Sequence, residues 1–104
     1  MLEATSNVLL LSMYQSDART YKKKDGSDGK APAAVKMKIS IPDDNGSTEE
    51  IVELPTEGKY AADPTLVSNA MKMQVHQQYA MTLGFKKFGN SPWRIEVLAI
   101  GKAA

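Results

Sequence analysis

The sequence predicts an all-β protein with five antiparallel strands, and three observations indicate this fold class. In residues 35–41, apolar side chains at odd positions alternate with Lys36, Lys38 and Ser40. The same period of two runs through residues 71–86, where only Gln77 breaks the odd apolar series, and returns in residues 93–99. Alternation of this kind is typical of strands with one buried and one solvated face.

The first three expected strands follow from local composition. The run "NVLLLSMYQ" is continuously apolar and suits a strand that is covered on both faces. The turn "PDDNGS" is a hairpin signal between the second and third strands. The third, "EEIVEL", is expected at a sheet edge, where its carboxylates stay solvated. These strands are expected over residues 7–21, 33–41 and 49–54.

The second half of the chain predicts a short helix and a long hairpin. Asp63 as N-cap and Pro64 in the first turn favour a helix of one or two turns near residues 64–70. Period two outweighs the helical pattern further on and predicts a fourth strand over residues 70–86. The turn-rich stretch "KKFGNSP" then leads into a fifth strand over residues 92–100.

A chain of 104 residues is expected to form one domain, residues 1–104, with a flexible basic loop at residues 22–32. Five antiparallel strands with a break between the third and fourth predict a five-stranded antiparallel OB-like small barrel with extended hairpins, closed or half-closed. A flat meander is the alternative. Closure would remove most of the unpaired strand edges.

Few residues could carry out chemistry. The chain has no cysteine, which excludes disulfides, thiolate zinc sites and cysteine nucleophiles. His76 is the single histidine and has no second histidine with which to form a metal site or catalytic pair. We therefore expect no enzyme activity, no cofactor and no metal. The N-terminus resembles neither a signal peptide nor a membrane span, so no membrane partner and a cytoplasmic location are expected.

The net charge of +1 conceals a basic segment, residues 18–38, followed by an acidic segment, residues 42–57. Two hairpin ends combine cations with aromatic rings, the pairing by which proteins bind single-stranded nucleic acid: cations follow the phosphates and rings stack on bases. Phe85 and Trp93 continue the inward series and are expected in the core. The candidate binding residues are Arg19, Tyr21, Lys22, Lys23, Lys24 and Lys30 at the first end, and Lys86, Lys87, Phe88 and Arg94 at the second.

Two stretches carry a resemblance to a known family. "ARTYKKKDGSDGKAPAAV" and "YAMTLGFKKFGNSPWRIEVLAIGKA" resemble the basic wing and the C-terminal hairpin of the single-stranded DNA-binding (helix-destabilising) proteins of filamentous phages. The resemblance implies an OB-like barrel, a homodimer, cooperative coating of single strands and no catalysis. It would place Tyr21, Lys22, Lys24 and Lys30 in the wing, Phe88 at the exposed tip and Arg94 on the final strand.

The expected function is therefore non-catalytic, sequence-nonspecific binding of single-stranded DNA during phage or mobile-element replication, in the cytoplasm of a bacterial host if the protein is phage-encoded. A preference for DNA over RNA is favoured but left open. The alternative is a small structural, assembly or adaptor protein. Its hairpins would then mediate subunit contacts, and the acidic residues 42–57 would pair with a basic patch of a neighbour.

Overall fold

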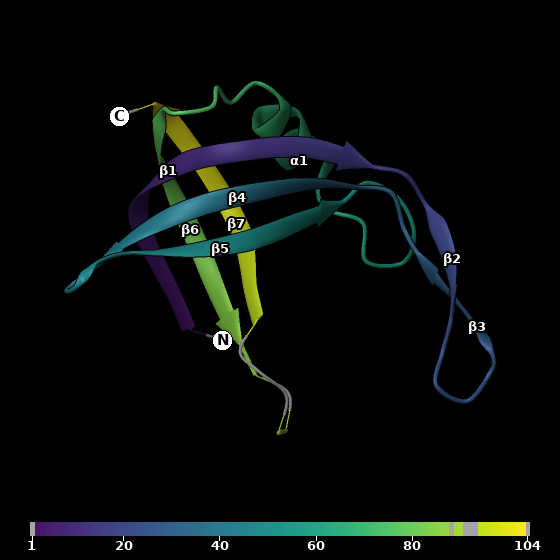
Figure 1. Ribbon diagram of the computed structural model, residues 1–104. Helices are drawn as coiled ribbons and strands as arrows, with labels where there is room; N and C mark the ends of the chain where they lie inside the picture. The colour runs from purple at the N-terminus through teal and green to yellow at the C-terminus, as the bar shows by residue number, and fades with distance from the viewer. Residues whose placement is uncertain (1, 88, 91–93, 104) are drawn as a thin grey trace.

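The computed structural model describes residues 2–87, 89–90 and 94–103. Strands dominate this part of the chain, which agrees with the expected all-β class (Figure 1). The main sheet has five strands, and every neighbouring pair is antiparallel. The strands lie in the order β5 (Gly46–Pro55), β4 (Ala34–Asp43), β1 (Leu2–Ser16), β6 (Gln78–Lys86) and β7 (Arg94–Ala103).

β1 lies at the centre of the sheet, where it pairs with two strands along its length. Its first half, Leu2 to Leu9, pairs with β6, and its second half, from Leu9 to Ser16, pairs with β4. The register with β4 shifts between Leu10 and Ser12. An irregularity of this kind bends a strand and increases its twist. The sheet therefore curls along β1. In Figure 1, β6 and β7 cross behind β4 and β5.

The core lies inside this curl and is built from alternating residues of the five strands of the main sheet. Val35, Met37 and Ile39 point inward from β4, as the period of two predicts, while Lys38 between them is exposed. Burial of each such side chain stabilises the fold by roughly 1.5–3 kcal/mol. The residues that are at most 3% exposed in this core are Val8, Leu10, Val35, Met37, Ile39, Val52, Leu54, Met81 and Leu83, together with Ala70 of the helix.

The expected helix is confirmed as α1 (Pro64–Met71). The Asp63 carboxylate accepts a hydrogen bond from the Thr65 backbone N–H at 2.7 Å, which satisfies one of the free donors of the first turn. The expected fourth strand is wrong in its first part, because β6 begins at Gln78 and not at residue 70. Met73 is buried from the turn after α1, and the Gln74 N–H donates to the Tyr79 hydroxyl at 2.7 Å, which fixes this turn to β6.

The expected barrel closure is also wrong. β5 and β7 are the two edges of the sheet, and no ladder joins them in the described part of the chain. Between them runs a groove of about 970 Å³ that both edge strands line together with Tyr60, Ala62 and Leu66. Ala62 and Leu66 pack against the core, and α1 packs against β7. The segment before α1 and its first turn therefore occupy the seam where closure would need a ladder.

The expected first strand, residues 7–21, is divided. β1 ends at Ser16, and β2 (Arg19–Lys22) pairs with β3 (Asp28–Ala31) in a separate two-stranded sheet. The segment expected as a loop, residues 22–32, thus contains a strand. We call residues 19–31 the arm, because this hairpin extends away from the main sheet (Figure 1).

Candidate nucleic-acid interface

The two faces of the arm carry different side chains. Residues directly opposite each other in an antiparallel ladder share a face. Arg19 and Tyr21, opposite Ala31 and Gly29, therefore form one face. The other face consists of Thr20 and Lys22, opposite Lys30 and Asp28. Sequence alternation thus separates the ring from most of the strand cations and sets both along the same hairpin.

The Tyr21 ring lies across the backbone of Gly29. A Cβ atom at Gly29 would stand 2.5 Å from the Tyr21 Cζ atom, closer than real contacts allow. Gly29 is buried beneath the ring, and Tyr21 itself remains 48% exposed. Cross-strand packing of an aromatic ring on a glycine holds the ring in place. Tyr21 is therefore a fixed ring with an open surface.

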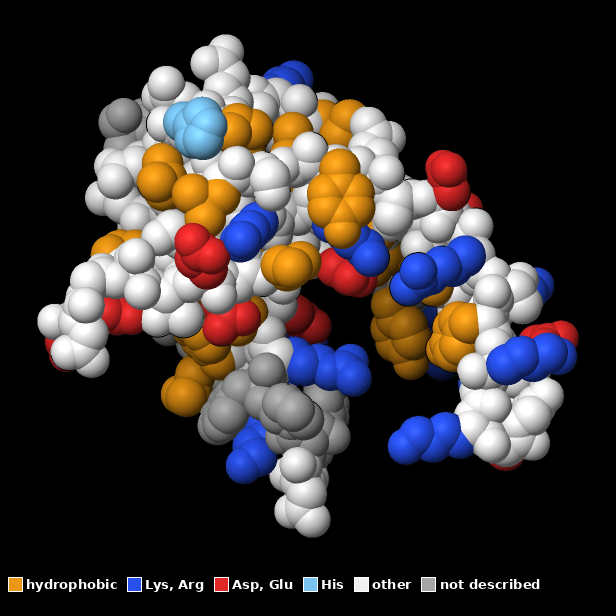
Figure 2. Space-filling model, viewed as in Figure 1, with side chains coloured by type: hydrophobic (Ala, Val, Ile, Leu, Met, Phe, Trp, Pro, Cys, Tyr) orange, Lys and Arg blue, Asp and Glu red, His pale blue; other side chains and the backbone are white. Residues whose placement is uncertain are grey.

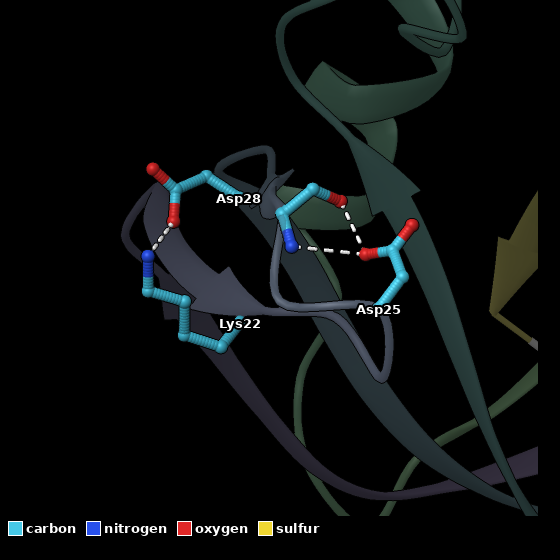
Figure 3. A network of polar contacts seen from close by, with 4 residues as sticks. Lys22, Asp25 and Asp28 are labelled. Carbon is cyan, nitrogen blue, oxygen red and sulfur yellow. Dashed lines mark hydrogen bonds and ion pairs between the residues drawn. The ribbon is translucent and has the colours of Figure 1, made fainter.

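The tip of the arm is an ordered turn (Figure 3). The Asp25 carboxylate accepts hydrogen bonds from the Ser27 hydroxyl at 2.6 Å and from the Ser27 backbone N–H at 2.9 Å. These hydrogen bonds lower the pKa of Asp25 below its usual value of 3.8. Lys22 Nζ lies 2.6 Å from Asp28 Oδ1, although both side chains are largely exposed, so this ion pair adds little stability.

The remaining cations of the arm point into solvent. Each of them is exposed, and none forms an ion pair within the part of the chain that the structure describes. Asp28 offsets the positive charge of Lys22. The charges of the other arm cations are not offset by such a pair and can attract a polyanionic ligand. The residues concerned are Arg19, Lys23, Lys24 and Lys30.

The second candidate cluster lies at the end of the β6–β7 hairpin. Lys86 lies opposite Arg94 in the ladder, and Lys86 Nζ is 3.0 Å from Glu96 Oε1. The Lys86 side chain is ion-paired and only 32% exposed, whereas Arg94 is exposed. Lys86 is therefore less available to a ligand than Arg94. Lys87 is exposed as well. Phe88, the expected ring of this tip, lies outside the described residues.

The aromatic residues expected in the core are only partly accounted for. Phe85 is partly buried and packs against the core, as expected. Trp93 lies outside the described residues. Val97 and Ile95 continue the inward series of β7.

The arm and the β6–β7 end extend on the same side of the sheet, below β5 in the view of Figure 1. Figure 2 shows a hollow between them, and Lys and Arg side chains border this hollow on both sides. The turn between β4 and β5, with Asp43 and Asp44, projects at the end of the main sheet opposite the arm (Figure 1). The fold thus separates the arm from the acidic turn.

The acidic segment has structural roles within the sheet. Lys36 Nζ lies 3.4 Å from Glu53 Oε1, and Lys38 Nζ lies 3.2 Å from Glu49 Oε2, across the β4–β5 ladder. Asp43 accepts hydrogen bonds from Thr48 and from the Asn45 backbone, which lower its pKa. Much of the negative charge of residues 42–57 is therefore matched by β4 or used in the turn.

Sequence reasoning missed one exposed ring. Tyr60, in the segment between β5 and α1, is 80% exposed, and Lys59 Nζ lies 5.6 Å from the centre of its ring. The dipeptide "KY" repeats, in reverse order, the "YK" of the arm, and this was the available signal. The surrounding segment, "TEGKYAADP", has no periodicity from which the position of the ring could be predicted.

The described residues contain no group of three or more His, Cys, Asp or Glu side chains that could hold a metal ion. Within the same residues, no helix is long and apolar enough to cross a membrane. No protein-family model matches the chain, and no curated protein or solved structure matches it significantly.

Proposed function

We propose that this protein is a non-catalytic, sequence-nonspecific single-stranded DNA-binding protein. The observation that carries the proposal is the shared orientation of its two cationic ends. The arm carries a fixed, half-exposed ring and four cations that form no ion pair with any residue the structure describes. It borders a hollow that Lys and Arg side chains also border from the other side. Flexible single strands are bound by this combination of cations and rings along a concave path.

The order of elements supports an OB-like interpretation of the open sheet. In the main sheet, three strands, β1, β4 and β5, precede α1, and the hairpin of β6 and β7 follows it. OB-folds are five-stranded, partly open barrels that bind oligonucleotides with the loops after their first and fourth strands. In this chain those two connections are the arm and the β6–β7 end.

The resemblance to filamentous-phage proteins adds the biological setting of the proposal. It supports a homodimer that coats single-stranded DNA during phage or mobile-element replication, in the cytoplasm of a bacterial host. Phosphate contacts would supply most of the affinity. Each phosphate neutralised on a single DNA strand makes the slope of log K against log salt concentration more negative by about 0.7.

Fluorescence anisotropy with labelled oligo(dT) tests this proposal. At low salt we expect micromolar or tighter binding, and a plot of log K against log salt concentration with a slope of about −3.5 to −4.2 if about five or six cations contact phosphates. The variant Lys24→Gln should weaken binding and make the slope shallower by about 0.7. The matched variant Lys72→Gln, at the C-cap of α1, should bind as the wild type does. Absence of binding at low salt would refute the proposal.

A second candidate function is a structural or assembly role. The observation that favours it is that β5 and β7, at the two edges of the sheet, each pair with a strand on one side only in the described part of the chain. Unpaired edges can accept a strand of another subunit. Self-association in sedimentation experiments, combined with no binding of oligo(dT), would select this function.

A further inference from the structure

The segment between β5 and α1 is fixed to the base of the arm. The Thr56 backbone N–H donates to the Ala33 carbonyl at 2.8 Å, and the Ala33 N–H donates to Glu57 Oε1 at 3.1 Å. The Ala62 N–H closes the other end of the segment onto the Pro55 carbonyl at 2.7 Å. These bonds hold residues 56–62 between the arm and the groove.

Tyr60 presents its ring from this segment. It lines the groove between β5 and β7, as does Arg94 from the β6–β7 end, and it is 80% exposed. A ring with this exposure contributes little to the stability of the core, since most of its apolar surface stays in water. Lys59 Nζ lies over one face of the ring, 5.6 Å from its centre, so a positive charge accompanies the ring and the other face is left for a base.

The charges of the groove decide which part of a nucleotide can face it. Glu50, Glu53 and Glu96 line the groove, and Lys86 and Arg94 line it toward the β6–β7 end. Glu53 and Glu96 form ion pairs with Lys36 and Lys86. Carboxylates repel phosphates at short range. The cations of the arm lie on one side of the hollow and those of the β6–β7 end on the other. The phosphates of a DNA strand that crosses here are attracted to the cations on both sides and repelled by the carboxylates along β5.

We propose that Tyr60 is a base-stacking platform between the two cationic ends. A single DNA strand crosses from the arm to the β6–β7 end, and one of its unpaired bases stacks on Tyr60. The bases face the groove and the phosphates face outward. Lys59 contacts the adjacent phosphate. The inference depends on the proposed function and adds a third contact to it.

Variants of Tyr60 test the proposal in the same anisotropy assay. Tyr60→Ala should weaken oligo(dT) binding roughly five- to hundredfold, as expected for one lost stacking contact. It should leave the salt slope unchanged, because no phosphate contact is lost. Tyr60→Phe should retain binding. The control Tyr14→Ala removes a tyrosine that is 55% exposed and does not line the groove, and it should bind within about twofold of wild type.

A strand without bases separates stacking from charge. An oligonucleotide of equal length made of abasic sites should bind wild type and Tyr60→Ala equally, because it offers phosphates alone. If Tyr60→Ala binds oligo(dT) as tightly as wild type, or weakens the abasic strand by the same factor, stacking on Tyr60 is refuted while the proposed function stands. If wild type binds neither strand at low salt, both are refuted.

Discussion

At the scale of single residues, the most constrained contact in the candidate interface is Tyr21 on Gly29. The ring occupies the space of any Cβ atom at position 29. Because the arm is a sheet separate from the main one, the contact can orient the ring without affecting the core. The close approach therefore serves the arm alone.

We expect Gly29→Ala to displace the Tyr21 ring and to weaken oligo(dT) binding by roughly the value of one stacking contact, five- to hundredfold. Global stability should change little. Anisotropy and a thermal melt measure the two effects, and Thr20→Ala, on the other face of the same ladder, is the matched control. Unchanged affinity in Gly29→Ala would show that the position of this ring does not matter for binding.

The cationic and aromatic residues of the arm were identifiable from sequence, because "RTYKKKDGSDGK" places them within twelve positions. Two facts were not. Lys86 forms an ion pair with Glu96, which depends on the β6–β7 register. Tyr60 joins the groove only because backbone bonds at Thr56 and Ala62 fold its segment back. Contacts between segments distant in sequence are not encoded in a local pattern.

At the scale of elements, the turn of the arm is a local structure with its own pH dependence. The hydrogen bonds from Ser27 lower the pKa of Asp25. A carboxyl group whose pKa is lower in the folded state contributes its stabilisation above the unfolded pKa and loses it as the pH falls through the folded pKa. The turn should therefore stay ordered at neutral pH and loosen only in acid.

We expect the amide proton of Ser27, followed by NMR, to shift with a midpoint below the usual value of 3.8. Asp25→Asn, which keeps an acceptor but does not titrate, should abolish this transition. A midpoint at or above 3.8 would contradict the role assigned to the two Ser27 hydrogen bonds.

Period two predicted β4 correctly because that strand has one buried and one wet face. The same signal extended the fourth expected strand too far. Met71 and Met73 continue the odd apolar series, yet Met71 ends α1 and Met73 is buried from the following turn. The Asp63 cap and Pro64 start a helix that local periodicity cannot distinguish from the beginning of a strand over so few residues.

At the scale of the whole molecule, the number and direction of the strands in the main sheet were predictable, whereas the separate two-stranded sheet of the arm and the absence of closure were not. Closure depends on whether β5 and β7 form a ladder, and residues of the segment before α1 and of its first turn line the groove between these two strands instead. Figure 2 shows the hollow between the arm and the β6–β7 end. An open sheet thus creates the path that a closed barrel would lack.

In the proposed complex, one DNA strand contacts both cationic ends at once. Titration of the isotopically labelled protein with oligo(dT), followed by amide NMR, tests it most directly. We expect the amide chemical shifts to change in the arm, at residues 59–60 and at the β6–β7 end. We expect no change in the turn at residues 43–46. Changes confined to the arm, or centred on the acidic turn, would contradict the claim.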